Sequence, residues 1–383
     1  MVLLIASLLP ALAVPTAQAG GSPFHELWRQ GHAEGFVGWE LANVGVVDGR
    51  LVFTPPAVGV AGRRSGTALS PERPTSEPFR DLIPSWNAET PTGTWLEARL
   101  RARIDGRWTR WYVLGVWTSD GAVEARHSVD GQDDADARVL TDTLALRTAG
   151  QAYQLELGLH SDHPDRSPGV SLAAVLASRT SGSAGVGGTE RRAWGRTLDV
   201  PERSQMVYPE GGEVWCSPTS TSMVMAYWSV RLANPGLDIP VPQVAAGTYD
   251  SVYRGNGNWP FNTAYAARGG LLGYVSRFSS LEQVERWIEL GVPIVASLAW
   301  GPGQLANAAI GSTDGHLLVI AGFSERGDVV VNDPAGDPRR GEAVRRVYDR
   351  GQFERLWLES SGGGVYLIYP GNHTIPSGAR GAW

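Results

Sequence analysis

Up to about residue 178, apolar and polar residues alternate in short runs, with the period of a half-buried β-strand. In residues 95–104 every second side chain is apolar and most of the intervening ones are charged. Asp105-Gly106 follows and predicts a tight hairpin turn into a return strand over 108–117. We therefore predict an all-β sandwich or jelly roll, with further strands over 50–53, 151–159 and 170–177.

From about residue 197 the pattern changes to a mixture of helical and extended segments. Residues 218–228 predict a compact helix. Ser280 to Gln283 have the sequence of a capping box. It opens a helix that ends before Gly291 and has an apolar face of Leu281, Val284, Trp287 and Ile288. Helices followed by consecutive strands indicate an α+β domain, with the strands expected over 293–300, 316–323, 328–331 and 364–369.

Two segments of simple composition separate these parts. Residues 179–196 are rich in small residues and predict an interdomain linker. Residues 2–14 form an apolar run, and small residues ending at Ala19 follow it, which is the pattern of a secretory signal peptide. We expect a secreted protein with a signal peptide over 1–19 cleaved after Ala19, a β-sandwich accessory domain over 20–178, the linker, and an α+β domain over 197–383.

Charge and motifs exclude several function classes. The 383 residues carry a net charge of -6, spread along the chain, so no basic patch predicts a nucleic-acid partner. Beyond the signal peptide no apolar run approaches the length of a membrane span. The nucleotide-binding pattern G-x-x-x-x-G-K-[ST] and the metal-binding patterns H-E-x-x-H and C-x-x-C do not occur. We therefore expect no cofactor, no metal site and no stable membrane span.

The chain has a single cysteine, Cys216. A lone thiol in an exported protein suggests a reactive site or pairing between molecules. A glycine-containing loop precedes Cys216 and the predicted helix follows it. The helix dipole and the free amides of the first turn favour a thiolate there and can also hold an oxyanion. Cys216 is therefore the candidate nucleophile, and the alternative is a small buried apolar residue.

A thiol nucleophile needs an imidazole base that a third group orients. Of the seven histidines, His316 begins an apolar strand. The next strand ends in Asn332-Asp333, and in an antiparallel hairpin this end lies beside the start of the first strand. Neighbouring strand residues point to opposite faces, so one of the two should reach His316. Asp333 is favoured because its charge also stabilises an imidazolium; the alternatives are a turn-forming Asp-Pro pair and a core histidine.

Three segments resemble the C39-like peptidase family in order and spacing: Cys216-Ser217-Pro218-Thr219-Ser220, Gly315-His316 and Asn332-Asp333-Pro334-Ala335. The resemblance spans about 205–335, extends to most of 197–370, and implies a papain-like fold with cysteine peptidase activity. It also implies an upstream glutamine that donates to the oxyanion hole, for which Gln205 is the candidate. Gln205 lies further from the cysteine than in papain, and Ser217 stands where many relatives have glycine. The N-terminal half is similar to the β-rich region ahead of some bacterial members, through Ser85-Trp86-Asn87-Ala88 and a series of tryptophans.

We therefore expect a secreted cysteine peptidase that hydrolyses peptide or amide bonds of a peptide or protein substrate. Its expected site consists of Cys216, His316, Asp333 and Gln205. A second expectation is a cell-wall amidase or an acyl-transfer enzyme that uses the same site on a cell-wall-associated substrate. The third is a non-catalytic protein with a degenerate peptidase fold that binds peptide or carbohydrate, with a sugar-stacking platform of Trp86, Trp108, Trp111 and Trp117.

Overall fold

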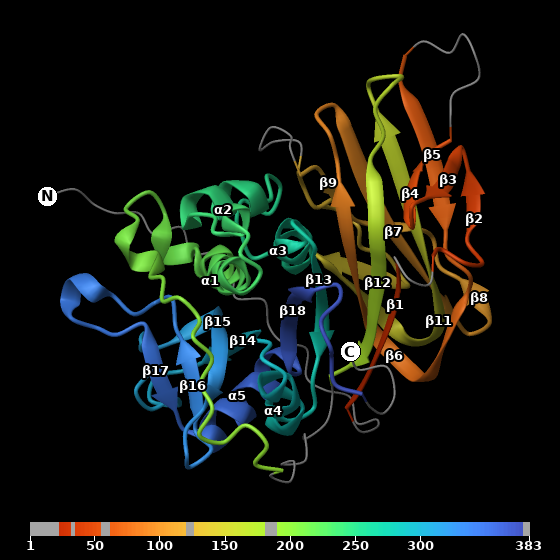
Figure 1. Ribbon diagram of the computed structural model, residues 1–383. Coiled ribbons are helices and arrows are strands. Elements are labelled where there is room, and N and C mark those ends of the chain that lie inside the picture. The colour runs from red at the N-terminus through yellow and green to blue at the C-terminus, as the bar shows by residue number, and fades with distance from the viewer. Residues whose placement is uncertain (1–22, 32–34, 55–61, 120–125, 181–189, 378–383) are drawn as a thin grey trace, which may run out of the picture.

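The structure, a computed structural model, describes residues 23–31, 35–54, 62–119, 126–180 and 190–377. The predicted signal peptide lies outside the described residues, as do residues 181–189 of the predicted linker. Figure 1 shows an N-terminal domain built from strands, coloured red to yellow-green, beside a C-terminal region of helices and strands, coloured green to blue. Within the described ranges, no helix has the length and apolar character to cross a membrane, and no group of three or more His, Cys, Asp or Glu could hold a metal ion.

The N-terminal domain is one 12-stranded sheet that is nearly closed. Its strands are β1 (Phe24–Gly31), β2 (Glu40–Ala42), β3 (Val44–Val47), β4 (Arg50–Phe53), β5 (Arg64–Leu69), β6 (Arg73–Glu89), β7 (Thr94–Ile104), β8 (Arg107–Trp108), β9 (Tyr112–Trp117), β10 (Ala137–Leu140), β11 (Thr143–Ser161) and β12 (Gly169–Arg179). The long strand β11 pairs with β5, β6, β7 and β10, and β6 also pairs with β12. The all-β prediction is confirmed, while the sandwich or jelly-roll arrangement stays a prediction.

Strand β7 shows how the alternating sequence forms this sheet. Leu96, Ala98 and Leu100 are buried, as the alternation predicts. Asp105 and Gly106 have φ values of 48° and 79°, the positive values that a two-residue hairpin turn requires. The return strand is split into β8 and β9, so it is less regular than the continuous strand predicted over 108–117.

The tryptophans of the predicted sugar platform occupy two different environments. Trp86 and Trp117 are fully buried in the core. Trp108 and Trp111 are half-buried, and both rings contact the guanidinium of Arg101, at 4.5 and 4.6 Å from the ring centroids. The prediction of one open platform of four rings is therefore wrong, because burial and the Arg101 side chain cover ring faces that a sugar would need.

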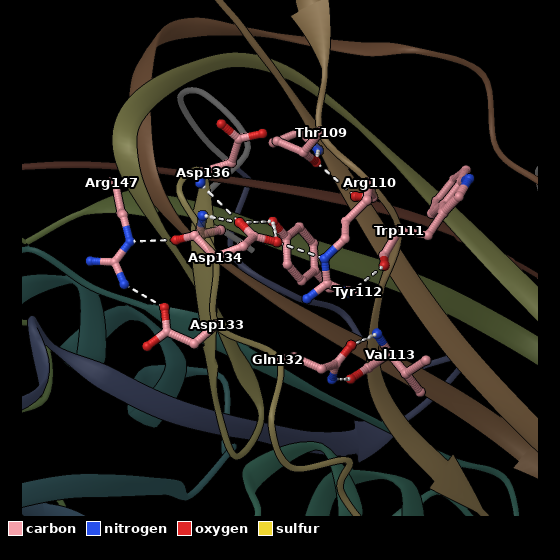
Figure 2. A network of polar contacts seen from close by, with 12 residues as sticks. Thr109, Arg110, Trp111, Tyr112, Val113, Gln132, Asp133, Asp134, Asp136 and Arg147 are labelled. Carbon is pink, nitrogen blue, oxygen red and sulfur yellow. Dashed lines mark hydrogen bonds and ion pairs between the residues drawn. The ribbon is translucent and has the colours of Figure 1, made fainter.

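A polar network fixes the segment that leads into β10, as Figure 2 shows. The Asp134 carboxylate accepts hydrogen bonds from the Tyr112 hydroxyl (2.8 Å) and from the Arg110 guanidinium (2.6 Å). The Gln132 side chain accepts from the amide of Val113 (2.8 Å) and donates to its carbonyl (2.7 Å), much as a neighbouring strand residue would. This network holds the segment against β9.

The C-terminal region contains a six-stranded sheet in the order β13-β18-β14-β15-β16-β17. Its elements are η2 (Gln205–Val207), η3 (Gly212–Val214), α1 (Cys216–Arg231), η4 (Pro235–Leu237), α2 (Val241–Thr248), α3 (Trp259–Ala266), β13 (Leu271–Arg277), α4 (Leu281–Glu289), β14 (Ile294–Trp300), β15 (Thr313–Phe323), β16 (Val329–Asn332), η5 (Pro338–Arg340), β17 (Arg345–Tyr348), α5 (Arg350–Ser361) and β18 (Gly364–Pro370). The mixed α and β prediction is confirmed, and the papain-like fold stays a prediction. The sequence did not predict β13, β17, α2, α3 or α5.

Helix α4 has the predicted apolar face, and all four of its predicted core residues are buried. The predicted capping box is wrong, because the Ser280 side chain makes no capping hydrogen bond. The Gln283 side chain instead accepts from the amide of Ser279 (2.6 Å), one residue further out. The amide of Leu281 donates to the Glu354 carboxylate (2.7 Å). A tertiary contact from α5 thus takes the place of the local cap.

Strand β6 of the N-terminal domain supplies hydrogen-bond partners to β13, which is an edge strand of the second sheet. Asn87 donates to the carbonyl of Gly273 (2.6 Å) and accepts from its amide (3.3 Å). The Ser85 hydroxyl accepts from the amide of Val275 (3.0 Å). The backbone groups of an edge strand need partners when they are buried. Side chains of one domain therefore cover the sheet edge of the other.

Replacing Asn87 with alanine should lower the free energy of unfolding by about 1–3 kcal/mol, because the buried backbone groups of Gly273 lose their partners. Calorimetric unfolding of the full chain would measure this loss. The matched control is Gln151→Ala, because the Gln151 amide is exposed and bonds the nearby carbonyl of Ala149. Equal stability of the two variants would show that the bonds to Gly273 do not hold the domains together.

Candidate active site

A tight loop brings Cys216 to the first residue of α1. Gly212 lies so close to Gln205 that a Cβ there would be 2.0 Å from the Gln205 carbonyl oxygen, so the loop needs glycine at this position. The rings of Tyr208 and Trp215 pack together within the loop, with centroids 5.8 Å apart. Amides in the first turn of a helix lack acceptors within the helix. Cys216 therefore lies at the positive end of the α1 dipole.

The start of β15 lies against this first turn of α1. His316 is buried and forms a hydrogen bond with the half-buried Cys216 side chain. The amides of Leu317 and Ser217 also bond the sulfur. One turn further along α1, the Ser220 hydroxyl donates to the carbonyl of Leu317 (3.0 Å). The backbone of Leu317 thus binds two successive turns of α1 and keeps the imidazole at the sulfur.

His316 contacts Asp333 on the other side of its ring, where Nε2 lies 2.7 Å from Oδ1. Nδ1 is therefore the ring nitrogen that remains for Cys216. The neighbouring Asn332 points elsewhere and donates to the carbonyl of Val200 (3.0 Å). The geometry thus decides between the two candidate residues of the hairpin. Asp333 contacts the imidazole, whereas the side chain of Asn332 helps to hold the segment before η2.

Two aromatic residues that the sequence analysis missed complete the surroundings of the pair. The Tyr348 hydroxyl donates to Oδ2 of Asp333 (2.5 Å) and accepts from the amide of Ala309 (3.3 Å). The Trp300 ring lies edge-on to His316, with centroids 5.6 Å apart. These residues end β17 and β14, and no local motif distinguishes them. In the register of β17 against β16, Tyr348 lies opposite Val329, so its long side chain reaches along the sheet to Asp333.

The electrostatics of the three groups favour an ion pair. Burial raises the pKa of Cys216, but the hydrogen bond and charge of His316 outweigh it and hold that pKa below its usual value. Burial lowers the pKa of His316, while the Asp333 carboxylate and Cys216 raise it to about 10. Burial raises the pKa of Asp333, while the charge of His316, its hydrogen bond and that of Tyr348 bring it below its usual value. Each of the three groups therefore shifts its neighbour toward the charged form: a thiolate, an imidazolium and a carboxylate.

Gln205 lies next to the loop that leads to Cys216, and its side chain is buried. Its Nε2 donates to the carbonyl of Glu213 (2.9 Å), and its backbone amide donates to the carbonyl of Pro334 (2.9 Å). Oε1 has no hydrogen-bond partner among the described residues. Gln205 therefore connects the loop before Cys216 with the turn after Asp333, and its contact with an oxyanion stays a prediction.

Two family profiles cover most of the chain. The profile of the peptidase C39 N-terminal domain matches residues 24–178, and that of the Peptidase_C39-like family matches residues 197–365. The chain belongs to the C39-like peptidase family. The second match contains Cys216, His316, Asp333 and Gln205. In this member of the C39-like peptidase family, the contacts described above therefore lie within the part that the family profile matches.

Other comparisons add little. No curated protein matches the chain. A solved structure of carbohydrate-binding modules from the β-sandwich superfamily is 11% identical over 37% of this chain, with a TM-score of 0.21, and the chain covers 58% of its length. The K1 cleaved adhesin domain of Lys-gingipain from Porphyromonas gingivalis W83 is 12% identical over 42% of this chain and is fully covered, with a TM-score of 0.18. Likenesses with such low TM-scores bear on neither fold nor function.

Iodoacetamide should label Cys216 at pH 7 about 10-fold faster in the unaltered protein than in His316→Ala, because loss of His316 leaves burial to raise the pKa of the thiol. In the unaltered protein the rate should fall as the pH drops through the depressed pKa of Cys216. Mass spectrometry over a pH series would measure both effects, and every adduct reports this site because the chain has one cysteine.

The matched control for this labelling is His373→Ala, because His373 bonds the carbonyl of Leu290 (2.9 Å) rather than a group of the candidate site. This variant should react as fast as the unaltered protein. Identical pH profiles for the unaltered protein and His316→Ala would contradict the ion pair.

Proposed function

We propose that this C39-like peptidase is a secreted cysteine peptidase that hydrolyses peptide bonds through Cys216, His316 and Asp333. The observation that carries the proposal is the continuous chain of contacts from the Cys216 sulfur through His316 to Asp333. Such a chain supplies a nucleophile, a base and an orienting group. It disfavours the non-catalytic alternative, because burying His316 and Asp333 beside the half-buried Cys216 is costly for a site without chemistry to perform.

In the proposed reaction the Cys216 thiolate attacks the carbonyl carbon of the scissile bond, and the carbonyl electrons move onto oxygen. The protonated His316 gives a proton to the leaving nitrogen as the C–N bond breaks, which leaves a thioester and a neutral imidazole. His316 then takes a proton from a water molecule whose oxygen attacks the thioester. The acid product and the thiolate separate, and the proton on His316 restores the ion pair. Asp333 keeps its charge throughout and holds the ring.

The oxyanion of each tetrahedral intermediate is proposed to bind the backbone amide of Cys216 and Nε2 of Gln205. A side-chain amide has two N–H groups, and Gln205 uses one for the carbonyl of Glu213, so a second remains for the oxyanion. Helix α1 adds its positive end at the same place. The nucleophile at the start of a helix, with its base on a sheet strand, is also the arrangement on which the proposed papain-like fold rests.

Cys216→Ala should lower kcat for peptide hydrolysis by about 1,000-fold or more, because the nucleophile is lost, while the fold stays intact. Turnover of casein and of a peptide library, with circular dichroism as the folding check, would measure this. The control is Val230→Ala, because Val230 is 78% exposed near the far end of α1. Undiminished turnover in Cys216→Ala would end the proposal, and turnover of peptidoglycan alone would replace it with the cell-wall amidase function.

Tyr348→Phe should lower kcat/KM about 3- to 20-fold with little change in KM, because Asp333 loses one hydrogen bond and holds His316 less firmly. That hydrogen bond lowers the pKa of Asp333. Its loss raises this pKa, so the fall in activity at acid pH should begin at a higher pH. Steady-state kinetics over a pH series would measure both effects.

Tyr227→Phe provides the matched control, because it removes a buried hydroxyl that donates to the carbonyl of Gly291 (2.7 Å), away from the candidate site. It should affect stability rather than the pH profile. If Tyr348→Phe also lost stability and kept an unaltered pH profile, Tyr348 would have a structural role alone.

A further inference from the structure

Tyr253 lies on the loop between α2 and α3 and is half-exposed (50%). Its ring lies over two glycines, so that a Cβ on Gly255 would come 2.8 Å from a ring carbon and one on Gly257 would come 3.1 Å from the hydroxyl. The glycine backbone therefore supports one side of the ring. An exposed aromatic ring with a supported back is a common feature of binding surfaces.

The Tyr253 hydroxyl lies beside Gly257, close to the start of α3, and within electrostatic range of Cys216. Burial and then the negative charges of Asp142 and Cys216 raise the pKa of the Tyr253 hydroxyl. The hydroxyl of Tyr366, which contacts the Ser217 hydroxyl (3.0 Å), is also within the electrostatic range of both Cys216 and Tyr253. Because Ser217 is the next residue after Cys216, its contact places the Tyr366 phenol beside Cys216, and Tyr253 lies within electrostatic range of both residues.

The N-terminal domain fixes the loop that carries Tyr253 through a buried carboxylate. Oδ1 of Asp250 accepts from the amide of Ser128 (3.0 Å), which belongs to the N-terminal domain. The same oxygen accepts from the amides of Val252 (3.1 Å) and Tyr253 (3.0 Å). Oδ2 accepts from the Asn258 side chain (2.9 Å), which caps α3. One carboxylate therefore joins the N-terminal domain, the backbone of Tyr253 and the start of α3.

A second contact comes from the hairpin tip between β10 and β11. There, Oδ2 of the buried Asp142 accepts from the amide of Trp259 (2.7 Å), at the start of α3. The Trp259 ring packs against Tyr366, with centroids 6.3 Å apart. Tyr366 contacts Ser217, as described above. A continuous path of contacts thus runs from the N-terminal domain to the residue beside the nucleophile.

Both contacts come from one rigid unit. Ser128 and Asp142 lie on either side of the segment that the network of Gln132 and Asp134 holds against β9 (Figure 2). The buried rings of Trp86 and Trp117 also pack on the ring of Phe261 in α3, with centroid distances of 6.2 and 5.6 Å. The N-terminal domain therefore fixes α3 and the loop before it from several sides.

We propose that the N-terminal domain completes the substrate site by holding Tyr253 beside Cys216, where its ring contacts an apolar side chain of the substrate next to the scissile bond. This inference rests on the proposed peptidase function. The exposed apolar side chains near the nucleophile point to the substrate class. Besides Tyr253, Val214 is 65% exposed two residues before Cys216, and Val252, the residue before Tyr253 in the same loop, is 36% exposed. A large apolar residue of the substrate would remove these surfaces from water.

The test compares peptides that carry a large apolar residue or a charged residue beside the cleaved bond. Tyr253→Ala should raise KM for the apolar peptides about 10-fold and leave KM for the charged peptides nearly unchanged, because the ring is lost and the ion pair remains. Tyr253→Phe should keep the apolar preference. Asp142→Ala should also lower the preference for apolar peptides, because the N-terminal domain then loses its bond to the start of α3. Asp142→Asn should retain more of this preference, because it keeps an acceptor for the amide of Trp259.

The iodoacetamide labelling rate of Cys216 separates this inference from the proposed function. If the unaltered protein cleaves peptides and Tyr253→Ala has the same KM for apolar peptides, the inference is overturned. The peptidase function then stays in place. A loss of apolar preference with an unaltered labelling rate would support it. No cleavage of any peptide by the unaltered protein would overturn the proposed function itself, and the inference would fall with it.

Discussion

The contact between the first turn of α1 and the start of β15 is the constraint on which the candidate site depends. Cys216 and His316 are far apart in sequence, and the backbone of Leu317 joins their elements. Its amide bonds the Cys216 sulfur and its carbonyl accepts from Ser220. Cys216 and His316 are therefore placed by regular secondary structure, which restricts the motion of each side chain more than a loop would.

The charge state of this site is decided by neighbouring groups that outweigh burial. The carboxylate, the imidazole and the thiol would each favour the neutral form if it stood alone here, because desolvation disfavours charge. Here each group stabilises the charge of its neighbour, and Tyr348 gives Asp333 a further hydrogen bond. Such a group of charges is stable only when complete, since removing one member leaves an unpaired charge in the interior.

The N-terminal domain contacts the C-terminal region through polar side chains that satisfy buried backbone groups. Asn87 and Ser85 bond the edge strand β13, while Asp250 and Asp142 form the bonds that fix the loop of Tyr253 and the start of α3. Bonds of this kind have specific geometry, so they fix the position of the two parts more closely than apolar packing alone. This arrangement argues for a structural link between the β-domain and the site rather than a loosely attached module.

The sequence by itself determined the all-β character of the first half, the mixed character of the second, and the placement of Cys216 at the start of a helix and His316 in an apolar strand. These features follow from local periodicity and from the residues at helix ends, which act over a few positions. Only the tertiary structure decided that Asp333 rather than Asn332 contacts His316, that Glu354 replaces the predicted capping box, and that Tyr348 supports Asp333. Each of these depends on which distant strand or helix lies alongside, and no pattern of neighbouring residues encodes that.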